Sequence, residues 1–61
     1  KIEIGPMSGE HNVRFWLEQR HIQPTDAMVK AIMDAAKEAR RILSETEIKE
    51  IIAKASAPVP S

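Results

Sequence analysis

Two histidines, His11 and His21, are the first residues of this sequence to test for chemistry, because a neutral imidazole binds metals and exchanges protons near neutral pH. On one continuous helix the two side chains would lie roughly 280° apart around the axis and about 15 Å apart along it. One helix therefore cannot direct both imidazoles at one metal ion. No acidic residue completes a ligand spacing such as H-x-x-E-H. The pattern favours two solvated histidines, and we predict no metal site.

Groups for covalent or acid–base catalysis are equally sparse. The chain has no cysteine, no G-x-S-x-G sequence and no glycine-rich phosphate loop. Its carboxylates alternate with basic residues along the predicted helices, which is typical of a solvated surface. A domain this small also has little room for the desolvated pocket that a ligand site needs. We predict no catalytic residue and no activity for the isolated chain.

A turn of sequence GPMSG, residues 5–9, precedes the first predicted helix. A helix that starts behind a glycine-containing turn exposes backbone N–H groups, which can bind an anion or face an active site. The simpler interpretation is that Ser8 caps the helix and that the small Gly9 allows close packing. Ser8 and Gly9 are therefore the candidate site residues of this turn, with both interpretations open.

Three stretches between the glycine and proline breakers carry apolar residues at helical spacing and are predicted to be helices. Their expected bounds are about residues 9–20, 26–41 and 45–55. Ser8 is the expected N-cap of the first helix and Thr25 that of the second. The third starts with a capping box, in which the side chains of Ser44 and Glu47 each accept from the other residue's backbone N–H.

The apolar residues on one side of each helix predict a single small core. The expected core residues are Val13, Trp16, Leu17, Ile32, Ile48 and Ile52. Phe15, Val29 and Met33 add more apolar surface than such a core needs. We interpret these three as an interface for another domain or subunit. The alternative is that the three helices bury them among themselves.

The ends and the composition complete the predicted fold. Residues 1–4 alternate polar and apolar side chains and should form a short extended entry, and residues 56–61 should form a disordered proline-containing tail. The 61 residues then give one all-α, three-helix domain over 1–55.

Nine basic and nine acidic residues balance, which argues against a nucleic-acid or anionic-membrane binder. Because the sequence opens on Lys1, we expect it to be part of a longer protein.

The order of motifs from Ile4 to about Ile52 resembles a known family. It runs through GPMSG (residues 5–9), a helix ending near LEQR (17–20), the helix start TD (25–26) and RILSETEI (41–48). This order resembles the helical subdomain that follows the barrel in the 2-isopropylmalate synthase, homocitrate synthase and citramalate synthase family. The resemblance covers roughly four-fifths of the chain, and its most specific element is the Ser8-Gly9 turn with the helix behind it.

In that family a TIM barrel with a divalent metal condenses acetyl-CoA with a 2-oxo acid, and small helical subdomains reach across a dimer to help cover the partner's active site. The resemblance implies that this chain is a non-catalytic subdomain of a cytoplasmic acyltransferase of amino-acid biosynthesis. Acetyl-CoA and the metal would bind the parent, and this chain would hold no cofactor. Its partners would be the rest of the parent and the dimer mate, with no nucleic acid and no membrane.

Two positions depart from the family pattern. Many relatives carry Lys-His before the Ser-Gly pair, where this chain has Pro6-Met7, so no role of a basic or imidazole side chain is carried over. Relatives commonly have glycine where this chain has His21, at a helix C′ position that favours a left-handed backbone. A histidine in that conformation costs about 1 kcal/mol or more.

Two functions of other classes remain open. The first is a free-standing helical module for protein–protein interaction. The second is a small helix-turn-helix nucleic-acid binder, with the helix over 26–41 as its probe. That helix carries basic residues, but Asp26 makes its first turn acidic, and in such proteins this turn normally contacts bases.

Overall fold

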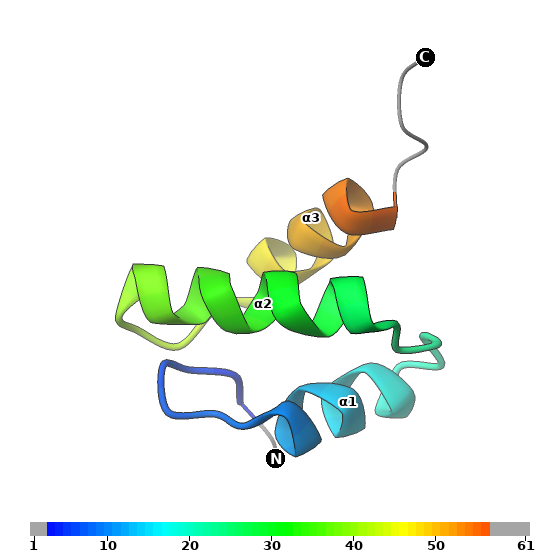
Figure 1. The fold of residues 1–61 in the computed structure, drawn as a ribbon, viewed down its shortest axis with the longest axis horizontal. Helices are drawn as coiled ribbons and strands as arrows, with labels where there is room; N and C mark the ends of the chain where they lie inside the picture. The colour runs from blue at the N-terminus through cyan, green and yellow to red at the C-terminus, as the bar shows by residue number, and fades with distance from the viewer. Residues whose placement is uncertain (1–2, 57–61) are drawn as a thin grey trace.

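The computed structural model describes residues 3–56, in which three α-helices follow a short extended entry (Figure 1). The helices are α1 (Glu10–Gln19), α2 (Asp26–Ala39) and α3 (Glu45–Ser56). α2 lies between the other two and packs on both. The predicted all-α fold is confirmed, and α3 includes Ser56, which was assigned to the tail. Residues 1–2 of the predicted entry and 57–61 of the predicted tail lie outside the described residues.

The start of α1 differs from the prediction by one residue. Gly9 is the N-cap, and no side chain accepts a hydrogen bond from the first turn. The Ser8 hydroxyl instead accepts from the Gly5 N–H at 2.9 Å, while the Ser8 N–H donates to the Gly5 carbonyl at 3.0 Å. The prediction that Ser8 caps the helix is therefore wrong, because its hydroxyl closes the turn that precedes the helix.

Gly9→Ser is expected to supply the missing cap. Gly9 has the extended backbone of an N-cap (φ −90°, ψ 173°), and a Cβ built there would meet nothing within 4 Å. A serine hydroxyl at this position accepts from the first turn, and the free energy of unfolding should rise by a few tenths of a kcal/mol. Urea denaturation followed by Trp16 fluorescence measures this. Ser8→Ala should have the opposite sign, and an unchanged Gly9→Ser midpoint would contradict the assigned cap.

α1 ends in a Schellman motif. The His21 N–H donates to the Glu18 carbonyl and the Ile22 N–H to the Leu17 carbonyl, each at 3.0 Å. His21 has φ 59°, so the left-handed C′ conformation predicted for this position is confirmed. Ile22 is half-buried and packs against the core, which supplies the apolar contact that accompanies such motifs.

α2 starts as predicted and ends early. The Thr25 hydroxyl accepts from the Met28 N–H at 3.2 Å. Arg40 takes a left-handed backbone (φ 56°) and its N–H donates to the Ala36 carbonyl at 3.1 Å. The helix therefore ends at Ala39, and Arg41, which was predicted to be helical, lies in the following loop.

One cluster of apolar side chains forms the core. Its buried members are Ile4, Val13, Trp16, Leu17, Val29, Ile32, Ala36, Leu43 and Ile48. Five of the six predicted core residues are among them, whereas Ile52 is only half-buried. In Figure 1 the C-terminal end of α3 extends away from α2, which is consistent with the incomplete burial of Ile52.

The interface prediction for Val29 is wrong, because its side chain is only 3% exposed and belongs to the core. Met33 is half-buried and packs against the same cluster. The physical reason is that α2 lies between two helices, so it buries a wider arc than one apolar stripe. The helices thus bury Val29 among themselves, whereas Met33 keeps part of its surface exposed and its place in an interface stays a prediction.

The entry segment closes one end of the core. The Leu43 N–H donates to the Ile4 carbonyl at 2.8 Å, and both side chains are buried. This bond joins the described part of the entry to the loop between α2 and α3. Ile4 of the expected extended entry is thus packed into the core.

Arg14 links α1 to the start of α2. Its Nε atom lies 2.8 Å from a Glu10 carboxylate oxygen, and its Nη2 atom lies 2.7 Å from Asp26 Oδ1. Hydrogen bonds to Glu10 and then to Asp26 raise the pKa of the Arg14 guanidinium. All three side chains are substantially exposed, so the network orients the helices and adds little stability.

Candidate functional site

The turn that holds Ser8 and Gly9 is closed by its own hydrogen bonds. The Ser8 hydroxyl is held by the Gly5 N–H and lies 3.4 Å from the Glu3 carbonyl. Gly9 is exposed, and the backbone donors behind it have no side-chain cap. Glu10 already places a negative charge at this helix end, where it offsets the positive end of the helix dipole. Ser8 therefore has a structural role in the turn, whereas the prediction that Gly9 allows close packing is wrong, because a Cβ there would meet nothing within 4 Å. The anion interpretation of this helix end stays a prediction.

Large apolar side chains are exposed at two places on the described surface. Phe15 is 47% exposed, in a shallow hollow beside His11, Arg14 and Glu18. Met7 is 95% and Ile42 53% exposed, and both line a second hollow of about 460 Å³ next to the Gly5–Ser8 turn. We name Met7 and Ile42 the Met7–Ile42 patch. Sequence reasoning missed this patch, because residues in turns have no periodicity that reports burial.

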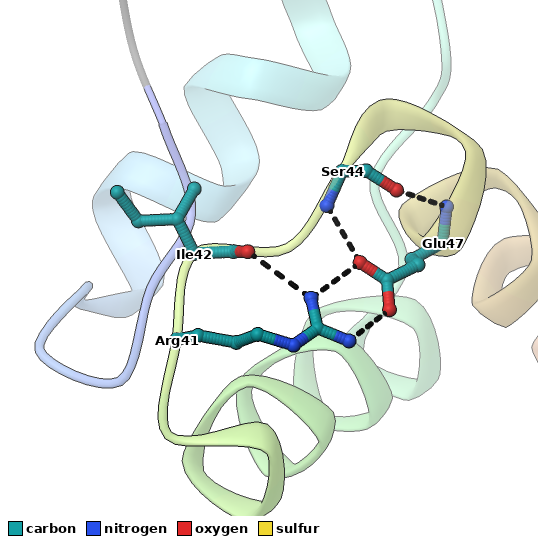
Figure 2. A network of polar contacts seen from close by, with 4 residues as sticks. All are labelled: Arg41, Ile42, Ser44 and Glu47. Carbon is teal, nitrogen blue, oxygen red and sulfur yellow. Dashed lines mark hydrogen bonds and ion pairs between the residues drawn. The ribbon is translucent and has the colours of Figure 1, made fainter.

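A network of polar contacts fixes the loop between α2 and α3 (Figure 2). The predicted capping box is confirmed: the Ser44 N–H donates to Glu47 Oε1 at 2.9 Å, and the Glu47 N–H donates to Ser44 Oγ at 3.2 Å. Arg41 adds a bidentate pair with the same carboxylate, with 2.7 Å between its Nη1 and Glu47 Oε1. Arg41 Nη1 also lies 3.3 Å from the Ile42 carbonyl. The guanidinium thereby connects the loop to the first turn of α3.

These contacts shift the ionisation of both partners. Hydrogen bonds from Arg41, followed by the Ser44 N–H, lower the pKa of Glu47 from 4.5 to about 2. The same carboxylate raises the pKa of Arg41. The pKa of Glu45, beside Arg20 and Lys49, is lowered as well. All of these charges are solvent-facing, so they organise the loop without forming a desolvated reaction site.

Acid should weaken the fold through Glu47. Because folding depresses its pKa from 4.5 to about 2, the stabilisation is complete above the unfolded-state value and is lost as the pH falls through that interval. We expect the urea midpoint to decrease between pH 5.5 and pH 2.5, and Glu47→Gln to reduce this dependence. Glu50→Gln is the matched control, since no ion pair involves Glu50 within residues 3–56. A Glu47→Gln variant with the unaltered pH profile would contradict the assignment.

A hollow of about 300 Å³ lies between the end of α1 and the start of α3, lined in part by two arginines. Arg20 stacks over the Trp16 ring, with 3.6 Å from its guanidinium carbon to the ring centroid, and its Nη2 lies 3.4 Å from Glu45 Oε1. Arg41 is bound to Glu47. Both guanidinium groups already have carboxylate partners, so none of the described residues that line the hollow offers a free cation to an anionic ligand.

Acidic side chains accompany the basic residues of α2 and of the loop after it. Lys30 lies 3.8 Å from Asp34, and Arg41 is paired with Glu47. The remaining two, Lys37 and Arg40, share a hollow with Asp34 and Glu38. Binding of nucleic-acid phosphates depends on several uncompensated cations, so this mixture of charges does not by itself favour a nucleic-acid surface.

The predictions about metal binding and membranes can be compared with the structure only over residues 3–56. There, no three His, Asp or Glu side chains gather in a group that could hold a metal ion. Over the same residues, every helix is too short or too polar to cross a membrane.

Comparison with protein-family models, with curated proteins and with solved structures finds no match to this chain. The family resemblance therefore depends on its motif residues alone.

Proposed function

We propose that this chain is a non-catalytic helical subdomain of an enzyme that condenses acetyl-CoA with a 2-oxo acid, of the 2-isopropylmalate or homocitrate synthase type. The observation that carries the proposal is the backbone of His21. Relatives commonly have glycine at this position, and His21 closes a Schellman motif with the left-handed conformation that glycine favours. At this position the chain thus has the left-handed backbone that a glycine would favour, although its own residue is histidine.

In the parent this subdomain supports dimer packing and active-site closure, which is a conformational role. Phe15 and the Met7–Ile42 patch are the surfaces that would contact the rest of the parent or the dimer mate, because exposed apolar side chains gain most from a protein contact. Acetyl-CoA and the divalent metal belong to the parent's barrel. The parent acts in the cytoplasm, with no nucleic acid and no membrane as partner.

The reading frame upstream of Lys1 tests the proposal first. A TIM barrel with an H-x-H metal motif should precede this chain, and its absence would end the proposal. The full-length protein should then release CoA from acetyl-CoA in the presence of a 2-oxo acid. A variant that ends before Lys1 should lose most of that turnover and dimerise more weakly. Full turnover and unchanged dimerisation of the shortened enzyme would contradict the assigned role.

Substitutions in the full-length enzyme locate the contact surface. Met7→Ser and Phe15→Ser remove exposed apolar side chains without opening the core, so the subdomain should stay folded. We expect lower dimer affinity or turnover from at least one of them. Ala53→Ser, at an exposed position of α3 outside the hollows described above, is the matched control. If neither serine variant differs from this control, these residues are not the contact surface.

A free-standing interaction module is the second candidate, and the Met7–Ile42 patch favours it. Two large apolar side chains around one hollow form a contact surface that needs no parent. Sedimentation velocity of the 61-residue chain over a range of concentrations tests self-association, and affinity capture tests other partners. A strictly monomeric chain that captures no partner would exclude this candidate.

A further inference from the structure

We draw no further inference here: the strongest candidate, the hollow between α2 and α3 that Ala35, Ala39 and Ile51 line beside Glu38 and Glu50, carries nothing because no feature of the described residues shows what covers it.

Discussion

Leu17→Ala is expected to leave most of the chain unfolded at 25 °C. The Leu17 side chain is fully buried among the core residues, and truncating such a leucine costs about 2–5 kcal/mol. A single core in a chain of this length rarely supplies more than about 3–5 kcal/mol. Far-UV circular dichroism at 25 °C should show the loss of helix, and Trp16 emission should move to longer wavelength as the indole meets water.

Phe15→Ala on the same helix is the matched control. Phe15 is 47% exposed, so its truncation should change the free energy of unfolding by no more than about 0.5 kcal/mol. The two substitutions thus test which side of α1 faces the core. Equal losses from Leu17→Ala and Phe15→Ala would show that the faces are wrongly assigned.

The double substitution His21→Gly, Arg40→Gly is expected to stabilise the chain. Each residue holds a left-handed backbone, which costs a non-glycine residue about 1–2 kcal/mol. Replacement by glycine relieves this strain, but the greater freedom of glycine in the unfolded chain offsets about 0.4–1 kcal/mol of the stabilisation. The net increase in the free energy of unfolding should be about 0.5–1 kcal/mol per site, and the two sites should add, because they lie in different loops.

Urea midpoints of the two single variants and the double variant measure this gain. Gln19→Gly is the matched control, because Gln19 precedes the cap and has a helical backbone, so glycine there should lower stability by up to about 1 kcal/mol. A lower midpoint for His21→Gly would mean that the imidazole makes a stabilising contact that outweighs the backbone strain.

The starts of α2 and α3 followed from the sequence more reliably than the end of α2. Thr25 and the Ser44–Glu47 pair cap their own first turns, so each start depends on a few neighbouring residues. The end of α2 has no such local marker. Arg40 adopts the left-handed conformation without being glycine, and the loop that follows brings Leu43 to Ile4 across the core. That contact joins distant parts of the chain, which no local pattern reports.

The same distinction separates the site residues that were predicted from those that were not. Helical spacing placed Phe15 off the buried side of α1, and its exposure agrees with this. Helical spacing could not predict whether the Val29 side chain is buried, because the width of the buried face of α2 depends on how many helices pack on it. Ser8 had two possible partners, the helix behind it and the turn before it. Its choice of the Gly5 N–H depends on the conformation of the Gly5–Ser8 turn.

The position of α2 between its two neighbours in the sequence has a kinetic consequence. Helix packing joins α1 to α2 and α2 to α3, so most native contacts form by closing short loops, and such chains fold in microseconds to milliseconds. The bond between Ile4 and Leu43 closes a much longer loop, so we expect docking of the entry to be a late step. In stopped-flow or temperature-jump experiments, Ile4→Val should therefore accelerate unfolding while the folding rate stays nearly unchanged.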